Sequence, residues 1–354
     1  MAARAVVALT FLAAHALVNA GMASSDVAVH HLHQGLLGWD AERYTGIAER
    51  GYAGLPLVEL RFFPLLPMLA RALGAIVGST GLALILIANV AALGFGALVH
   101  ALCLHERGDE RLARRATWFA AFTPAAFVLV WGYSEAVWGC LAVGTVLALR
   151  RRWWWAAAAL ALLGGLARPV GALLVLPALV EAGRGLAAAR GRELAARVAA
   201  VAAPLAGTGA FLAWVGAKFG DPLLPFRIQQ DPKFRGELAD PVSSLLAIVG
   251  TTFRDGLGVG SARLVWAGLL VGLVVGACRA WPASYGALAT AALLVALSTD
   301  HLGSFERYGF AAFPVVLHLA AIARTTTAQR VVVGLGAGAM AVYGTLALLG
   351  RYVP

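Results

Sequence analysis

Long, uninterrupted apolar segments limit the possible folds of this sequence more than any other feature. Hydrophobic residues make up 60% of the 354 residues and charged residues 13%, and the mean hydropathy is +0.79. A soluble globular chain is about half apolar and about a quarter charged, so a water-soluble domain of this length could not bury so much apolar surface. Within a bilayer every backbone polar group must be paired, which leaves helices and closed barrels. The apolar runs are too continuous for the alternating strands of a barrel, so the sequence predicts an all-α, polytopic transmembrane helical protein.

The apolar segments predict about 11 spanning helices, within a range of roughly 9 to 12, because about 20 residues cross a ~30 Å hydrocarbon core. The first is interpreted as a retained helix and not as a cleaved signal peptide. Several segments are nearer 15 residues, so those that meet near 131–135 and 167–169 are predicted to be short helices meeting within the membrane. The predicted segments are 4–23, 80–103, 116–131, 135–149, 153–167, 169–183, 198–217, 263–279, 283–298, 309–323 and 331–350.

The positive charge of the chain is concentrated in one set of connecting segments. The segments at 4, 106–115, 150–152, 181–197, 279 and 324–330 contain 15 basic and five acidic residues, whereas the rest of the chain contains 13 of each. Cytoplasmic loops of membrane proteins carry an excess of Lys and Arg. This rule explains the net charge of +10 better than nucleic-acid binding does. It predicts a cytoplasmic N-terminus and places the two long polar segments, 24–79 and 218–262, on the extracytoplasmic side.

The first of these long segments contains the aspartate that we consider the best candidate for chemistry. A short helix is predicted at 40–50, which places Arg43 and Tyr44 on the same face as Asp40. Asp40 is open to two interpretations that do not exclude each other: a general base acting on an acceptor hydroxyl and the N-cap of this helix. The apolar stretch 64–78 is predicted to be an interfacial or re-entrant helix, because a span there would reverse the side of the arginines at 107–115.

Three further positions in the chain could contribute to a site. Glu135 lies in an apolar hairpin, where a charge costs about 2.5 kcal/mol or more and normally has a partner or a purpose; alternatively it is hydrated at the outer interface. Arg168, between two apolar segments, could bind phosphate through its planar guanidinium or extend towards lipid headgroups. Arg307, next to Tyr308, could face a lipid phosphate or be neutralised by Glu306.

Other polar groups give weaker signals. The loop 220–230 contains prolines and the amides Gln229 and Gln230, so it is either a folded loop that hydrogen-bonds sugar hydroxyls or an inert connector. His30, His31 and His33 are too crowded to match an established metal-ligand spacing, and we expect no metal there. No glycine-rich loop of the kind that binds nucleotide phosphates is present in the sequence.

Together these residues resemble one family, the PIG-V-type mannosyltransferases, which include the second mannosyltransferase of GPI-anchor assembly and its bacterial relatives. The most specific part is the first loop, where Trp39-Asp40 is followed by Tyr44, Ile47-Ala48, Gly51-Tyr52 and the run Phe62-Phe63-Pro64-Leu65-Leu66-Pro67. The resemblance extends from residue 38 to residue 314, through Thr123-Pro124-Ala125-Ala126, Tyr133-Ser134-Glu135, Ala167-Arg168-Pro169, Gly171, the loop from Gly220 to Gln229, Arg307-Tyr308 and Phe313-Pro314. The chain departs from the family at Pro169, where a small polar residue would follow the arginine, and it has no tryptophan directly after Gln229. These departures concern the acceptor more than the fold.

The resemblance implies a GT-C glycosyltransferase: one transmembrane domain over 1–354, in a bacterial plasma membrane, with its active site on the extracytoplasmic face. The donor would be a polyprenyl-phosphate mannose, the acceptor a glycolipid or another lipid-linked molecule, and no metal or other cofactor is expected. Asp40 would deprotonate the acceptor hydroxyl, and Arg168 and Arg307 would stabilise the leaving phosphate. The remaining predicted contacts to substrate or to the catalytic groups are Trp39, Arg43, Tyr44, Glu135, Gln229 and Tyr308.

Two alternatives stay open at this point. A GT-C enzyme with the same fold could transfer arabinose, glucose or another sugar, because a fold does not determine a substrate. The helix content and the intramembrane charges would also suit a lipid or solute transporter without enzymatic activity, which inverted repeats or paired broken helices would support. Neither feature is visible in the sequence.

Overall fold

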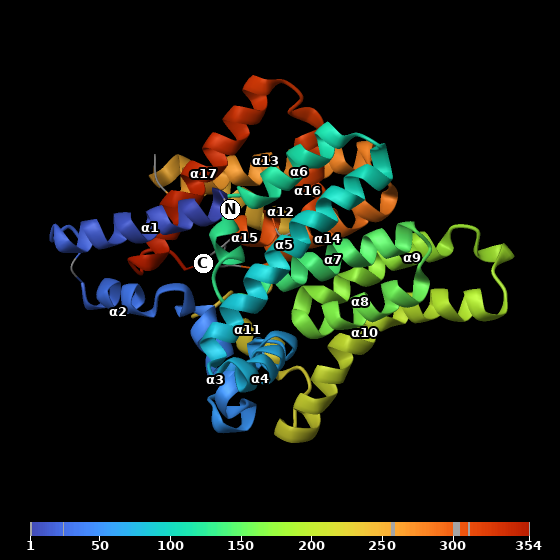
Figure 1. Ribbon diagram of the computed structural model, residues 1–354, viewed down its shortest axis with the longest axis horizontal. Coiled ribbons are helices and arrows are strands. Elements are labelled where there is room, and N and C mark those ends of the chain that lie inside the picture. Colours follow the sequence, from blue (N-terminus) through green and yellow to red (C-terminus); the bar gives the residue numbers. More distant parts are fainter. Residues whose placement is uncertain (1, 24, 256–258, 300–304, 311, 354) are drawn as a thin grey trace. The chain divides into compact units, whose positions relative to one another are not determined.

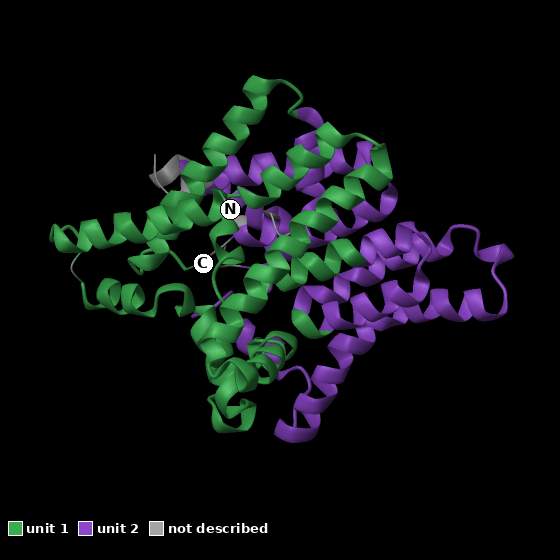
Figure 2. Cartoon of the chain, in the orientation of Figure 1, with its two compact units in different colours: residues 1–144, 166–168, 323–354 green, residues 145–165, 169–322 purple. Residues whose placement is uncertain are grey.

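The computed structural model describes residues 2–23, 25–255, 259–299, 305–310 and 312–353, and this part of the chain consists of helices joined by turns and loops (Figure 1). No strand occurs among these residues, and helices account for 81% of the structure, in agreement with the predicted all-α class. Contacts divide the chain into two compact units (Figure 2). Unit 1 comprises residues 1–144, 166–168 and 323–354, and unit 2 comprises residues 145–165 and 169–322.

Unit 1 contains the two ends of the chain and the first long polar segment. Its helices are α1 (Ala2–Asn19), α2 (Asp26–Gln34), α3 (Asp40–Arg50), α4 (Leu65–Val77), α5 (Thr80–Arg107), α6 (Glu110–Ala121), the first part of α7 (Glu135–Arg150) and α17 (Thr326–Leu348). Short 3-10 turns lie between them: η1 (Gly35–Leu37), η2 (Tyr52–Gly54), η3 (Leu57–Arg61) and η4 (Ala126–Leu129). The described residues of the segment 24–79 therefore form several helices and 3-10 turns, and the predicted helix at 40–50 is α3.

The packing of unit 1 joins helices that are far apart in the sequence. α1 packs along α17, and α5 packs against both α4 and α6. Phe127, Trp131 and Met340 lie in the buried cluster between η4 and α17. α5 is tied to its neighbours by Asn89, whose side chain accepts a hydrogen bond from Arg4 Nε (2.9 Å) and donates one to the carbonyl of Val130 (3.0 Å). This unit thus gathers α3, the start of α7 and the C-terminal helix into one folded body.

Unit 2 consists of the helices between the end of α7 and α16. They are α8 (Trp154–Ala167), α9 (Val175–Gly183), α10 (Gly191–Phe219), α11 (Leu224–Gln229), α12 (Pro241–Asp255), α13 (Val259–Ala280), α14 (Ala283–Leu297), α15 (Phe305–Phe310) and α16 (Phe313–Ile322), with the 3-10 turns η5 (Pro169–Leu174) and η6 (Leu186–Ala188). α8 and α10 approach to backbone contact, since a Cβ at Gly165 would meet the carbonyl of Pro204, and one at Gly207 would meet that of Leu162. Small residues permit such close approach of helices in membranes.

Within the described part of the chain, five helices are long and apolar enough to cross a membrane. They are Ala2–Asn19, Thr80–Arg107, Gly191–Phe219, Arg263–Ala280 and Thr326–Leu348. Six apolar helical segments are shorter: Leu65–Val77, Trp154–Ala167, Pro169–Gly183, Pro241–Gly250, Ala283–Leu297 and Phe313–Ile322. By length and composition these helices are those of an integral membrane protein.

The structure differs from the predicted helix boundaries most clearly at 116–131. The segment 116–131 is not one helix, because α6 ends at Ala121 and only the short turn η4 follows. Pro124 explains the break, since proline lacks the backbone donor and its ring excludes the preceding residue from the helical region. The segment predicted to be the second long loop, 218–262, contains helices among its described residues: α11, α12 and the first residues of α13.

Candidate functional site

The candidate site in unit 1 begins at the N-terminus of α3. Trp39 is the N-cap of this helix, and Asp40 is its first helical residue. The interpretation of Asp40 as the N-cap is therefore wrong, because the chain turns into the helix one residue earlier than the residue preference predicts. The Asp40 side chain is half-buried and stands in the first turn, where a negative charge interacts favourably with the helix dipole.

The backbone of Trp39 adopts an unusual conformation. Its φ of 56° and ψ of −123° lie in a region that bulky residues rarely occupy. Two contacts hold the residue there: the indole Nε1 donates a hydrogen bond to the carbonyl of Ala347 (3.0 Å), and the ring stacks on His31 at a centroid distance of 4.1 Å. Backbone strain of this kind concentrates at functional sites and persists where the surroundings fix it. Trp39 thus fixes the direction in which Asp40 leaves the turn.

Two buried tyrosines connect α3 to the start of α7. The backbone N–H of Asp40 donates to the hydroxyl of Tyr133 (3.3 Å), and the hydroxyl of Tyr44 donates to Ser134 Oγ (2.8 Å). Burial raises the pKa of Tyr44 well above its ordinary value. Arg168 opposes this rise, whereas Asp40 and Glu135 add to it. The Tyr44 hydroxyl is therefore a neutral hydrogen-bond donor within electrostatic reach of all three charged side chains.

Glu135 and Arg168 form an ion pair between the first residue of α7 and the residue that follows α8. Their side chains are only 6% and 11% exposed. Glu135 is therefore not hydrated at an interface, and Arg168 does not extend towards headgroups; each is the other's charge partner. Breaking such a buried pair by removing one member costs about 3–5 kcal/mol. The pair fixes the guanidinium of Arg168 in the same unit as Asp40 and Tyr44.

Arg43 does not share the surroundings of Tyr44, although both follow Asp40 by about one turn. Arg43 Nη1 lies 3.0 Å from Oε1 of Glu59, which belongs to η3. Glu59 is 3% exposed, and its Oε2 is buried without a hydrogen-bond partner among the described residues. Burial raises the pKa of Glu59, and the Arg43 guanidinium opposes this rise. Arg43 thus has an ion-pair partner that the sequence interpretation did not single out, and its supporting role beside Asp40 stays a prediction.

The other three predicted site residues belong to unit 2. Gln229 is the last residue of α11, and Arg307 and Tyr308 lie in α15. Arg307 is 5% exposed and its guanidinium carbon lies 5.8 Å from the centre of the Tyr308 ring, while Arg235 approaches the same ring to 4.6 Å. The predicted neutralisation of Arg307 by Glu306 concerns a side chain that the structure does not describe.

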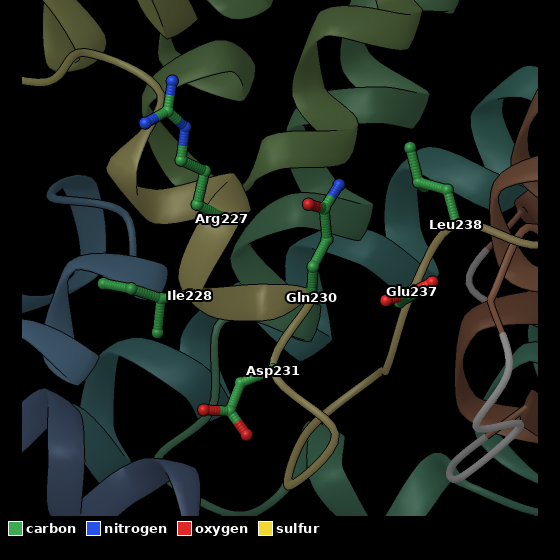
Figure 3. A pocket seen from close by; sticks show the side chains of 6 residues that line it. All are labelled: Arg227, Ile228, Gln230, Asp231, Glu237 and Leu238. Carbon is green, nitrogen blue, oxygen red and sulfur yellow. The ribbon is translucent and has the colours of Figure 1, made fainter.

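The loop after α10 forms a polar depression of about 670 Å³ (Figure 3). The side chains that line it are Arg227, Ile228, Gln230, Asp231, Glu237 and Leu238. Arg227 is held by Asp221 through an ion pair of 2.9 Å. Two carboxylates, an amide and a guanidinium surround this depression. Together they can donate hydrogen bonds to hydroxyl groups and accept hydrogen bonds from them. The amide that lines this depression is Gln230, next to the predicted contact Gln229.

The histidines near the start of the chain have aromatic contacts. His31 stacks on Trp39, and His30 meets the edge of His31 at 5.5 Å. Burial lowers the pKa of His31, which favours the neutral ring that stacks on Trp39. Among the described residues, no group of three or more His, Cys, Asp or Glu side chains is placed to hold a metal ion. The expectation that the protein needs no metal stays a prediction.

The geometry therefore brings Trp39, Asp40, Tyr44, Glu135 and Arg168 together in unit 1. Tyr133 and Ser134 also belong to this group. In the sequence, only their position directly before Glu135 indicated them. Comparison with known proteins adds no family to this picture. No protein family model matches the chain, and no curated protein or solved structure is detectably similar to it.

Proposed function

We propose that this protein is an inverting GT-C-type mannosyltransferase that takes mannose from a polyprenyl-phosphate donor and passes it to a glycolipid or another lipid-linked acceptor. The proposal includes about 11 membrane-spanning segments, several of them shorter than 20 residues, and an active site on the extracytoplasmic face of a bacterial plasma membrane. One observation supports the proposal most strongly. Asp40, in the first loop that resembles the family, lies in the same compact unit as the buried Arg168, and the charges of both side chains act on the Tyr44 hydroxyl.

The reaction assigns a task to each of these groups. The acceptor oxygen attacks C1 of mannose, and Asp40 takes the proton of that hydroxyl. The bond between C1 and the phosphate oxygen breaks, and polyprenyl phosphate leaves with the bonding electrons, so the configuration at C1 inverts. Arg168 stabilises the negative charge that develops on the phosphate, and a phosphate contact of Arg307 stays a prediction from the resemblance. Glu135 fixes the direction of Arg168, as the ion pair supports.

Tyr44 and Trp39 have positioning tasks in this proposal. Tyr44 ties α3 to Ser134, directly before the glutamate that binds Arg168, and so couples the base to the phosphate-binding group. Trp39 fixes the turn that precedes Asp40. The depression lined by Gln230, Asp231 and Glu237 has groups that can donate hydrogen bonds to sugar hydroxyls and accept hydrogen bonds from them.

The proposal is tested by substituting the base. Membranes that contain Asp40→Asn are expected to lose transfer of labelled mannose from polyprenyl-phosphate mannose, because general base catalysis contributes roughly 100- to 10,000-fold. Asp109→Asn is a matched control, since Asp109 caps α6 through the N–H groups of Arg111 and Leu112 and asparagine caps equally well. Full activity of folded Asp40→Asn protein would remove Asp40 as the base.

The sugar and the acceptor are identified by mass spectrometry of glycolipids after deletion of the gene. Loss of one mannose from a defined glycolipid is the expected result. Loss of a pentose or of a different hexose would keep the GT-C mechanism and replace mannose as the donor sugar. An unchanged glycolipid profile would contradict the proposal.

A further inference from the structure

A second depression lies at one end of unit 2, where α7 ends and where α8 and α10 begin. It has a volume of about 480 Å³, and the side chains that matter for its chemistry are Arg152, Trp153, Trp154, Trp155, Arg192 and Glu193. It belongs to the group of segments whose excess of arginine predicts a cytoplasmic location. None of these residues takes part in the proposed glycosyl transfer.

The charge of this depression is positive, because its one carboxylate is already bound. Glu193 accepts hydrogen bonds from Nη2 (2.7 Å) and Nε (3.2 Å) of Arg197. Arg197 is 2% exposed and its guanidinium carbon lies 4.9 Å from the ring of Trp154, so the charge of Glu193 is matched by a buried guanidinium. Arg152 and Arg192 are exposed, and neither has an ion-pair partner in the described part of the chain. Two guanidinium groups therefore remain available to an anion.

The aromatic side chains indicate that this anion lies at the membrane surface. Trp153 is 57% exposed and Trp155 is 53% exposed, directly at the start of the apolar helix α8. α10, which is long and apolar enough to span the membrane, begins at Gly191 on the other side of the depression. Tryptophan is enriched where the hydrocarbon of a bilayer meets its headgroups. The depression thus lies at the level at which two apolar helices leave that hydrocarbon.

We propose that this depression binds the headgroup phosphate of an anionic phospholipid, with Arg152 and Arg192 as its charge partners. Basic pockets at the ends of membrane helices bind anionic headgroups in this manner. The exposed rings of Trp153 and Trp155 pack on the glycerol and the first carbons of the acyl chains. A soluble phosphate ester would satisfy the arginines but would leave both indoles in water, so the structure favours a lipid.

The test compares lipid retention by the purified full-length protein in native mass spectrometry. Wild-type protein is expected to retain phosphatidylglycerol in preference to phosphatidylcholine. The variant Arg152→Gln/Arg192→Gln is expected to lose this preference by roughly 30-fold, because each arginine near an anionic headgroup contributes about 1 kcal/mol. The control Arg324→Gln/Arg330→Gln removes two exposed arginines of unit 1 and is expected to retain the preference of the wild type.

Three outcomes would overturn the inference. They are equal retention of the two lipids by the wild type, an equal loss of preference in the control variant, and displacement of the lipid by an equal concentration of soluble glycerol phosphate. Folding of each variant is checked by circular dichroism. A second readout does not depend on arginine: phosphatidylglycerol with brominated acyl chains should quench wild-type tryptophan fluorescence more than that of Trp153→Phe/Trp155→Phe, and equal quenching would contradict the proposed packing.

Discussion

Replacing Glu135 by glutamine removes the carboxylate that pairs with Arg168 inside unit 1. Both side chains are almost inaccessible, with exposures of 6% and 11%. A buried charge that loses its partner costs about 3–5 kcal/mol, whereas the loss of both charges leaves nothing uncompensated. We therefore expect Glu135→Gln and Arg168→Gln each to lower the free energy of unfolding by about 3 kcal/mol, and the double variant to lose about as much as one single variant.

The coupling energy of this double-mutant cycle is the quantity to measure. The free energy of unfolding of the detergent-solubilised protein can be obtained for all four proteins by titration with SDS, followed by circular dichroism. The expected coupling between Glu135 and Arg168 is about 3 kcal/mol. The exposed pair Glu110–Arg114 of α6, whose side chains are 55% and 66% exposed, is a matched control with an expected coupling of about 0.3–0.5 kcal/mol. A coupling no larger than that of this surface pair would refute the buried ion pair.

Two further perturbations test the packing and the buried phenol. Gly207→Ala should destabilise unit 2 by about 1–3 kcal/mol, because its Cβ would meet the carbonyl of Leu162. Gly209→Ala should not destabilise it, because a Cβ there would have nothing within 4 Å. Thermal unfolding of both variants checks this, and equal melting temperatures of the two variants would contradict the close approach of α8 and α10. The raised pKa of Tyr44 stabilises the fold below the pKa of an unfolded tyrosine, about 10, and this contribution is lost as the pH rises above it. Tyr44→Phe should therefore reduce the fall in unfolding free energy above pH ~10, and an unchanged alkaline profile would contradict the burial of this hydroxyl.

The helices could be predicted from the sequence because apolar runs in a membrane protein leave the backbone few alternatives. The helix at 40–50 and the apolar stretch at 64–78 correspond to α3 and α4. The error at 116–131 came from weighing hydropathy above the local effect of Pro124. The assignment of the cap to Asp40 followed residue preference, whereas the contacts of Trp39 with Ala347 and His31 decide the turn. Such contacts come from segments that no local pattern identifies.

The candidate site shows the same division between local and long-range information. Glu135 was recognised from the cost of a charge among apolar residues and Arg168 from its place between two apolar segments, but their pairing depends on how the chain returns after α7 and α8. Arg43 pairs with Glu59 across a loop that contains two 3-10 turns. The sequence gives no periodicity in this loop from which the pairing could be predicted. Residue chemistry therefore identified most members of the site, and tertiary packing selected their partners.

The most direct test of sugar transfer uses the purified protein in proteoliposomes with doubly labelled polyprenyl-phosphate mannose and a lipid extract as the source of acceptor. Wild-type protein is expected to produce a mannosylated lipid and free polyprenyl phosphate in equal amounts, and Asp40→Asn is expected to produce neither. Unchanged donor that has moved across the bilayer, with no mannosylated product from wild-type protein, would contradict the proposed transferase and indicate a transporter.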